Sequence, residues 1–495
     1  MREESLTNRV RAGVGWSATS VILSYALALV RSIIIARLLA PGDFGLFGMA
    51  ATLLGALASL TNMGLDASLI ARKFSNDEDL AAHLNTVWTA ELVRRFLLTL
   101  LLLAFVFPAA KFYGDARLIL ILPLVSLTPL IEGFQNIGLI IFRKRVSFRR
   151  IVWFEQTSSL VSALIALTLA VWTRNVWALV LGQLLSTLAS VLLSYLFHPY
   201  RPRLAFDKNA FRQTFNFGKH MLLISLTAYI TTTVDNVLLG KWFGAMILGV
   251  YVLAYNLASL PVNIIGGVVG SVVFPAYAEL KAKGGERLEA AFERVLMISA
   301  ALLMIVTVPL LLLADEIVLL LYGAKWAAAA PLLRVLALIG FWRGLLQIIA
   351  PLIISVRGPA PEAKAKTVEA LGFLLLLYPL TKNYGALGAA WAGVIIYLLT
   401  ILIRCWLIRT FAPGASKRMI TIVAATLCAG LCGVVCGALA LTLAETMFVR
   451  LIFGGAVSIA VMIVSLLLML PDLRREAGKI MAWRLPLMPE KRRML

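Results

Sequence analysis

Fourteen apolar runs divide this chain, and most of them are long enough to cross a lipid bilayer. A spanning helix needs about 20 predominantly apolar residues, and 61% of the 495 residues here are hydrophobic. The sequence therefore predicts an all-α integral membrane protein with 14 transmembrane helices. The predicted spans are residues 14–39, 44–70, 86–108, 117–141, 152–172, 175–197, 217–242, 247–275, 290–313, 328–355, 364–380, 385–408, 418–442 and 447–470.

Basic residues alternate between the loops in a way that sets the orientation of these spans. The chain has a net charge of +21, which in a soluble protein would favour a nucleic-acid partner. With the N-terminus placed inside, 32 of the 46 Lys and Arg residues lie in inner segments and seven lie in outer loops. Cytoplasmic loops of membrane proteins carry such an excess. We therefore expect both termini in the cytoplasm, an even number of spans and no nucleic-acid partner.

Two stretches that are 204 residues apart resemble each other. Tyr25–Leu53 and Tyr229–Leu257 align without a gap, and Arg31 of the first falls on Asp235 of the second. The identical pairs are Tyr25 and Tyr229, Val30 and Val234, Gly45 and Gly249, Ala50 and Ala254, and Leu53 and Leu257. Transporters are commonly built from repeated halves, with the substrate site at the repeat interface.

The repeat divides the chain into two six-helix halves of the same orientation around a central cavity. Residues 1–203 form the predicted N-terminal half and residues 204–412 the C-terminal half. Residues 413–470 add two further spans, and residues 471–495 form a basic cytoplasmic tail. The outer loops are short, so any activity is expected within the bilayer.

Arg31 is the strongest functional candidate, because a charge at mid-bilayer costs about 2.5–3.5 kcal/mol and must face protein or water. Ser20 and Ser24 precede it on the same helix face. The repeat pairs Arg31 with Asp235, and two interpretations stay open. The two charges form an ion pair that holds the halves together, or Arg31 binds an anionic group while Asp235 titrates or pairs with it.

Other polar residues within the spans are weaker candidates. Glu132 is deep enough to line the cavity or to be structural, and we consider it for ion coupling. Arg343 is deeper in its span than Arg334. Glu91 has the helical spacing to pair with the arginines at 94 and 95.

Neither a metal site nor enzyme chemistry is expected. Cys428, Cys432 and Cys436 share one face of an apolar helix, where small residues favour helix packing over metal binding. We find no P-loop and no HExxH pattern, and the short outer loops argue against a membrane-bound polymerase or ligase. The sequence therefore predicts a transporter without a cofactor.

Two segments carry a resemblance to a known family. IARLLAPGDFGLFGMA (Ile35–Ala50) resembles the N-terminal signature of Wzx-type polysaccharide flippases, which belong to the multidrug/oligosaccharidyl-lipid/polysaccharide exporter superfamily. The run Asp235–Leu280 resembles their seventh and eighth spans, especially in the branch of colanic-acid-type exporters. The resemblance covers about residues 10–410.

The resemblance implies a flippase of the bacterial inner membrane. It would move an undecaprenyl-pyrophosphate-linked oligosaccharide between leaflets by alternating access, surrounded by membrane lipid. It implies a monomer with a polysaccharide polymerase and glycosyltransferases as possible partners. The related lipid II flippases carry an arginine on the first span, which fits Arg31.

The residue types agree with such a substrate. Arginine is the preferred bidentate partner of a pyrophosphate, and Arg31 and Arg343 are the candidates. Sugars need hydroxyl, amide and aromatic contacts, and the candidate residues for these are Ser20, Ser24, Tyr25, Tyr229, Thr231, Thr232 and Asn256. The alternative is an ion-coupled multidrug exporter of the same superfamily, which would have a cavity lined by acidic residues.

Overall fold

The computed structural model describes residues 6–62, 64–65, 69, 74, 76–144, 148–282, 285–443 and 446–475. Nearly all of this part of the chain is helical, and it contains no strand. The predicted all-α membrane fold is therefore confirmed. Most of the predicted basic tail lies outside the described residues.

The first half contains eight described helices of very different lengths. They are α1 (Leu6–Leu38), α2 (Pro41–Thr61), α4 (Asp77–Ala104), α5 (Val106–Tyr113), α6 (Leu118–Gly133), α7 (Leu139–Lys144), α8 (Phe148–Thr173) and α9 (Trp177–Phe197). An extended linker from residue 198 to residue 207 joins α9 to the second half.

The second half and the extra spans contain eight further described α-helices, of which α10 and α14 are the longest in the described chain. They are α10 (Lys208–Ala282), α11 (Gly285–Leu312), α12 (Ala314–Tyr322), α13 (Ala329–Arg357), α14 (Pro359–Arg409), α15 (Pro413–Thr442), α16 (Met447–Val449) and α17 (Gly455–Met469). Both α10 and α14 are broken by one residue with positive φ, Gly244 at 75° and Gly385 at 61°. Glycine adopts this conformation without steric cost.

The number of spans agrees with the sequence only if these breaks are counted. Ten described helices are long and apolar enough to cross a membrane, and the bent pair α4–α5 would be an eleventh. Dividing α10 and α14 at their glycines and adding the short α6 would give fourteen. The count of 14 thus stays a prediction.

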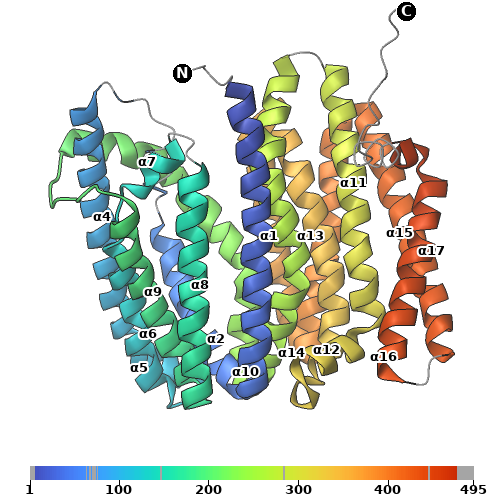
Figure 1. The fold of residues 1–495 in the computed structure, drawn as a ribbon, viewed down its shortest axis with the longest axis horizontal. Coiled ribbons are helices and arrows are strands. Elements are labelled where there is room, and N and C mark those ends of the chain that lie inside the picture. Colours follow the sequence, from blue (N-terminus) through green and yellow to red (C-terminus); the bar gives the residue numbers. More distant parts are fainter. Residues whose placement is uncertain are drawn as a thin grey trace, which may run out of the picture.

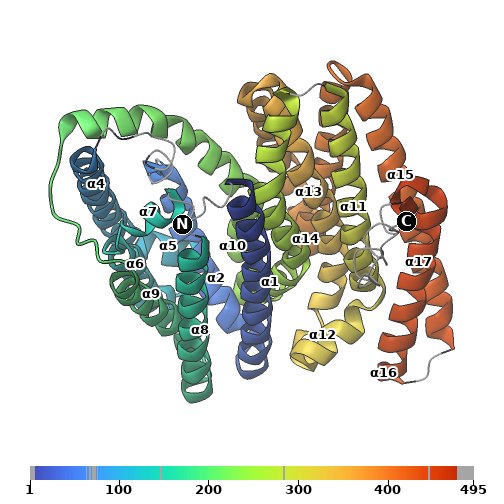
Figure 2. The same ribbon diagram turned by 45° about the horizontal axis from the view of Figure 1, so that its top comes forward.

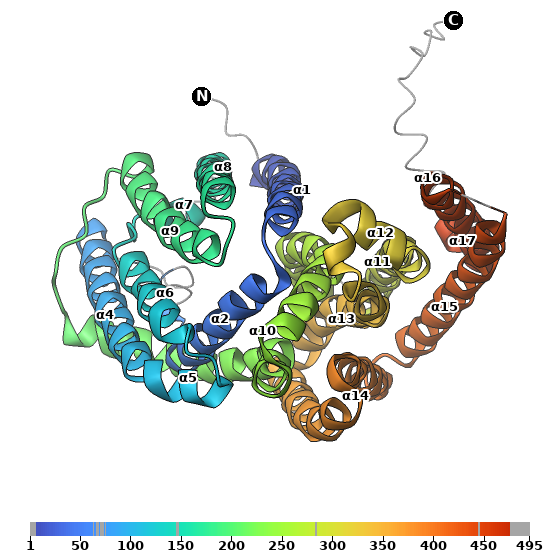
Figure 3. The same cartoon turned by 90° about the horizontal axis from the view of Figure 1, so that it is seen from below.

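Figure 1 shows the first half, the second half and α15–α17 side by side. The helix α1 begins, and α17 ends, at the same end of the molecule. We call this the inner end, following the predicted orientation, and the opposite end the outer end. The first turns of α10 lie across the inner end of the first half (Figure 2). Seen from the outer end, α2 and α10 lie at the centre of the molecule (Figure 3).

The two halves differ in how tightly they are packed. In an 18-residue apolar stretch of α11, α13 or α14, 56–67% of the residues are buried inside the protein. The same share is 11% in α1 and 22% in α8 and α9. The main hydrophobic core accordingly lies largely in the second half. More of the helix surface in the first half is therefore left to face lipid or a cavity.

A buried ion cluster stabilises the second half. Arg404 is fully buried and donates to Glu362 at 2.7 Å and to Glu369 at 3.2 Å. Lys366 also contacts Glu369, at 2.8 Å. Two carboxylates and two cations thus meet at the inner part of α14, and each carboxylate has a cationic partner.

Replacing Arg404 is expected to destabilise the protein strongly. The substitution Arg404→Met would remove a cationic partner from two buried carboxylates. Such a change lowers the free energy of unfolding by about 3–5 kcal/mol. Thermal unfolding of the purified protein measures the effect. The control is Arg409→Met, an exposed arginine at the end of the same helix. Equal melting temperatures for the two variants would contradict a stabilising role for the cluster.

Two helices end earlier than predicted, for the same local reason. The helix α2 ends at Thr61 rather than near 70, and α6 ends at Gly133 rather than near 141. After each end, an Asn side chain accepts a hydrogen bond from a backbone N–H two residues on. Asn62 binds Gly64 at 3.0 Å, and Asn136 binds Gly138 at 2.9 Å. Such Asn turns compete with the helix.

The cysteine interpretation was wrong for two of the three residues. Cys428 and Cys432 are exposed on α15, and Cys436 is intermediate. The packing face of α15 is formed by Gly433 and Gly437, which lie against Ser458 and its neighbours on α17. Close helix packing through glycine leaves the cysteines on another face.

Candidate functional site

A cavity of about 750 Å³ lies beside α10 within the first half. Its walls come from α1, α2, α6, α8, α9 and α10, and Tyr322 of α12 adds one residue. The first half therefore contributes most of the lining, and the second half contributes mainly α10. This is less symmetric than the predicted cavity between two equal bundles.

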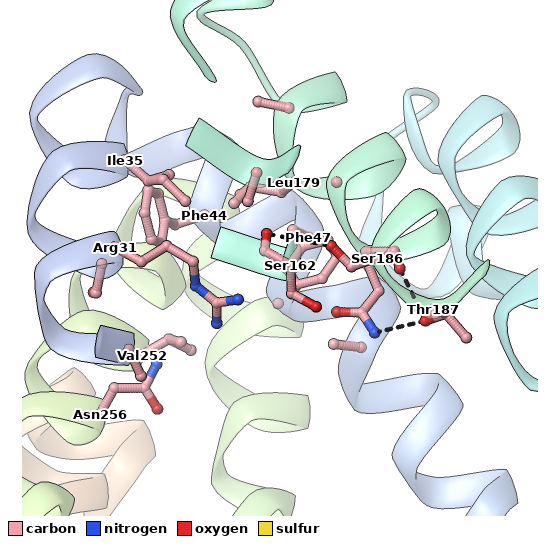
Figure 4. A pocket seen from close by; sticks show the side chains of 18 of the residues that line it. Arg31, Ile35, Phe44, Phe47, Ser162, Leu179, Ser186, Thr187, Val252 and Asn256 are labelled. Atoms are coloured by element: carbon pink, nitrogen blue, oxygen red, sulfur yellow. Dashed lines mark hydrogen bonds between the residues drawn. The ribbon is translucent and has the colours of Figure 1, made fainter. Parts of the chain in front are cut away.

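Arg31 projects into this cavity from α1. Figure 4 shows its guanidinium directed away from α1 toward the polar side chains of α8 and α9. The side chain is half-buried, and no hydrogen bond or ion pair joins it to another described residue. A guanidinium has five N–H donors, so Arg31 is available to an anionic ligand.

Two glycines from the repeat close the outer end below the cavity. A Cβ added at Gly45 would lie 1.6 Å from the carbonyl oxygen of Ala245, and one added at Gly249 would lie 1.9 Å from that of Pro41. These positions are 204 residues apart in each case, so the contact is reciprocal. The backbones of α2 and α10 therefore touch here, at equivalent positions of the two aligned segments.

Basic side chains add a second reciprocal contact at the outer end. Arg37, at the end of α1, donates to the carbonyl of Leu321 at 2.8 Å, where α12 ends. Its repeat equivalent, Lys241, donates to the carbonyl of Phe112, where α5 ends. Cations are favourable at helix C-termini because the last carbonyls lack partners. Each half thus caps a short helix of the other half.

A third contact at the outer end joins α1 to the segment after α12. Lys325 donates to the carbonyl of Leu39 at 2.6 Å, and the Trp326 indole donates to that of Ala36 at 2.8 Å. The Trp326 ring also packs edge-on against Phe44, with centroids 5.1 Å apart. The halves are therefore held together at the outer end.

Three of the predicted site residues line the cavity together with Arg31. Tyr25 and Asn256 are two of them, as predicted. Glu132 is the third, but its carboxylate forms an ion pair with Arg95. Arg95 also contacts Glu91, which pairs mainly with Arg94 at 2.6 Å, the helical pairing expected from the spacing.

Five other candidates are not among the lining residues, and their side chains bond to a neighbouring helix or to their own helix. Ser20 and Ser24 accept hydrogen bonds from Gln156 of α8, at 2.8 and 2.7 Å. The Tyr229 hydroxyl donates to the carbonyl of Thr52 at 2.8 Å. Thr231 and Thr232 donate to carbonyls one turn back in their own helix. Hydroxyls in lipid-embedded helices often find such partners, because water is absent there.

The expectation that Arg31 and Asp235 face one cavity was wrong. Asp235 is buried in the second half and accepts a hydrogen bond from Tyr251 at 2.6 Å. The cavity is lined instead by Thr233 and Asn236 of α10. Because residues in a helix are about 100° apart, Asp235 points away from that face.

Arg343 also lies in the second half rather than in the cavity lining. It donates to the Tyr255 hydroxyl at 2.6 Å, and the Tyr255 ring stacks on Tyr251. A buried polar cluster therefore runs from Asp235 through the two tyrosines to Arg343. This cluster and the cavity lie on different sides of α10.

Four polar residues of α9 line the cavity and were not predicted. They are Gln183, Ser186, Thr187 and Ser190. Their spacing puts them on one helix face, and they interrupt an otherwise apolar span. The spacing of these four residues is visible in the sequence, but none of them carries the charge that marks a candidate site within a span.

Comparison with known proteins identifies the family. Residues 34–331, more than half of the chain, match the family described as polysaccharide biosynthesis protein. The chain belongs to this family. It is 26% identical to the succinoglycan biosynthesis transport protein ExoT of Rhizobium meliloti, over 66% of each chain. It is 23% identical to the lipopolysaccharide biosynthesis protein WzxC of Escherichia coli, over 84% of each chain.

Solved structures show the same fold in members of the predicted superfamily. The lipid II flippase MurJ, in an inward closed conformation, matches with a TM-score of 0.72 and 16% identity over 92% of this chain and 99% of that one. An inward-facing multidrug transporter of the MATE family matches with a TM-score of 0.62 and 15% identity, over 82% and 98%. This polysaccharide biosynthesis family member is thus a multi-pass membrane protein with a MurJ-like and MATE-like fold.

Proposed function

We propose that the protein is a flippase for an undecaprenyl-pyrophosphate-linked oligosaccharide. The observation that carries the proposal is the guanidinium of Arg31, which projects into a cavity of about 750 Å³ and has no hydrogen-bond or ion-pair partner among the described residues. A diphosphate is the ligand that such a group binds best, because arginine forms bidentate charge-assisted hydrogen bonds to phosphate. Tyr25 and Asn256 would contact the sugar.

Transport by alternating access fits the distribution of contacts. The outer end is closed by the glycine contact and by the contacts of Arg37, Lys241 and Lys325. A cavity that contains an arginine, above a closed outer end, is the arrangement expected of an inward-facing state, which would accept a headgroup from the cytoplasmic leaflet. Outward opening would then require these outer contacts to separate.

The relatives support this assignment more than the multidrug alternative. WzxC and ExoT are named for polysaccharide biosynthesis and transport, and MurJ is named as a flippase. A drug exporter for hydrophobic cations would need a free carboxylate in its cavity. The single carboxylate among the described lining residues, Glu132, is paired with Arg95.

The cellular setting follows from the same proposal. The protein would act as a monomer in the inner membrane, with both termini in the cytoplasm. Glycosyltransferases would supply the lipid-linked repeat unit and a polymerase would consume it on the other side. Transport itself requires no catalysis by this chain.

Deleting the gene tests the proposed function in the cell. Surface polysaccharide should disappear, and the lipid-linked repeat unit should accumulate in the cytoplasmic leaflet, because nothing would carry it outward. The wild-type gene should restore both. Normal export in the deletion strain, with no other flippase gene present, would exclude the proposal.

We also propose that Asp235 takes part in coupling transport to an ion gradient. Its carboxylate is buried beside Tyr251 and in the same cluster as Arg343. Asp235→Asn keeps the shape and the acceptor for Tyr251 but removes the charge. We expect it to fold normally and to lose any response of the transport rate to an imposed proton gradient.

The matched control for this test is Asp315→Asn, because Asp315 is exposed at the outer end and pairs with Arg334. It should retain the wild-type response. If Asp235→Asn transports at the wild-type rate with the same pH dependence, Asp235 has no part in coupling. Glu132→Gln can be measured in the same assay.

A further inference from the structure

One face of α9 forms a neutral polar wall in the cavity. The wall consists of Gln183, Ser186, Thr187 and Ser190, and Ser162 of α8 lies next to it. Figure 4 shows Ser162, Ser186 and Thr187 on the side of the cavity toward which Arg31 points. Amide and hydroxyl groups in lipid-embedded helices are costly unless they are satisfied. A face that carries four of them therefore requires an explanation.

The wall satisfies only part of its own hydrogen-bonding capacity. Thr187 donates to the carbonyl of Gln183 at 2.9 Å, and Ser186 donates to that of Ser162 at 3.4 Å. Within the described part of the chain, the Gln183 amide makes one long hydrogen bond, 3.4 Å to Thr187, and its side chain is exposed and lines the cavity. A primary amide offers two N–H donors and a carbonyl acceptor. Most of the capacity of Gln183 is therefore available to a ligand.

The charges around the wall select against an acidic ligand. Among the described residues that line the cavity, the ionised side chains are Arg31 and Glu132. Helix α6, which carries Glu132, packs directly against α9. Glu132 is already paired with Arg95, and Arg31 would be occupied by the diphosphate, so a carboxylate lying along the wall would find no free cation among the described lining residues. Burying a carboxylate without a cationic partner is costly.

We infer that the α9 wall binds the sugars nearest the diphosphate and that these sugars are uncharged. The inference rests on the proposed flippase function and names the substrate class for it. Neutral hexoses and N-acetylhexosamines present the hydroxyl and amide groups that pair with Gln183, Ser186 and Ser190. A cavity of about 750 Å³ has the size of a site for a small ligand. It would hold the diphosphate and the first sugars, and the rest of the glycan would extend beyond it.

A transport assay with two matched lipids tests this inference. Both are polyprenyl diphosphates with a short glycan, one with a neutral hexose next to the diphosphate and the other with a hexuronic acid in its place. In proteoliposomes, the wild-type protein should move the neutral lipid about tenfold faster. This corresponds to the loss of one or two hydrogen bonds and the cost of burying a carboxylate that has no cationic partner.

Variants of Gln183 make the test specific. Gln183→Leu should slow the neutral lipid by about five- to tenfold and reduce the preference. Gln183→Arg should raise the rate for the acidic lipid, because it adds a cation at the wall. The control is Gln156→Leu, which removes a half-buried amide that binds Ser20 and Ser24. It is expected to lower stability and leave the preference unchanged.

The outcomes separate the inference from the function on which it rests. Equal wild-type rates for the two lipids, or Gln183 variants that keep the wild-type preference, would overturn the sugar assignment while the flippase function stands. A wild-type protein that moves neither lipid would overturn the proposed function itself.

Discussion

Arg31→Ala is expected to reduce flipping of the lipid-linked oligosaccharide by about 100-fold while the protein folds normally. The guanidinium is the one cation among the described lining residues of the cavity, so no other lining side chain can neutralise a diphosphate there. Two charge-assisted hydrogen bonds account for an effect of this size. Arg31→Lys should retain more activity, with a loss of about tenfold, because lysine keeps the charge but not the planar pair of donors.

The control for Arg31 is Arg334→Ala. Arg334 is a partly exposed arginine of α13 that pairs with Asp315 at the outer end, away from the cavity. It should transport at nearly the wild-type rate. Rates are measured in proteoliposomes and divided by the amount of folded protein. An Arg31→Ala variant as active as Arg334→Ala would exclude a role of Arg31 in binding the substrate.

Gly249→Ala is expected to prevent the outer end from closing. The added Cβ would lie 1.9 Å from the carbonyl oxygen of Pro41, and a backbone atom cannot move aside as a flexible side chain can. Gly45→Ala creates the same steric clash, because its added Cβ would lie 1.6 Å from the carbonyl oxygen of Ala245. Both variants should shift the protein toward an outward-open form and lose most transport. Gly42→Ala is the control, because a Cβ there meets nothing within 4 Å.

Cysteine labelling distinguishes such a shift from misfolding. The four native cysteines are replaced by serine, and Asn256→Cys places one thiol in the cavity. A membrane-impermeant reagent added from outside should label it slowly in the otherwise unchanged protein and in Gly42→Ala, and rapidly in Gly249→Ala. If Gly249→Ala is folded, active and protected from outside, the glycine contact is not the outer closure.

The repeat in the sequence predicted backbone positions better than side-chain directions. Gly45 and Gly249 occupy equivalent places and contact each other's helices, because an alignment fixes where along a helix a residue lies. It does not fix how the helix is rotated in its surroundings. Arg31 faces the cavity, whereas Asp235 faces Tyr251 in the denser second half. An isolated charge in a span was therefore a good guide to the site only for Arg31.

Polar residues inside the spans could not be assigned from sequence alone. A hydroxyl in a helix can bond to its own backbone, bridge to a neighbouring helix or face a cavity, and the residue type is the same in each case. Ser20 and Ser24 bridge to Gln156, Thr231 bonds to its own helix, and Ser190 faces the cavity. Only the arrangement of the helices separates these cases.

The short helices at the outer end were also beyond sequence analysis. Helix α12 has nine residues, too few to cross a membrane, so its apolar pattern did not indicate a span. Its end is nevertheless capped by Arg37 of α1. This hydrogen bond joins residues that are 284 positions apart, so no local sequence pattern predicts it.

The most direct test of the central claim is a leaflet-specific assay with the purified protein. A labelled polyprenyl-diphosphate oligosaccharide is placed in one leaflet of protein-containing vesicles, and its arrival in the other leaflet is followed with an impermeant enzyme that acts on the exposed sugar. The wild-type protein should accelerate this movement far above the rate in protein-free vesicles, and Arg31→Ala should return it nearly to that rate. Movement no faster than in protein-free vesicles, with correctly folded wild-type protein, would contradict the claim that this cavity carries the headgroup across the membrane.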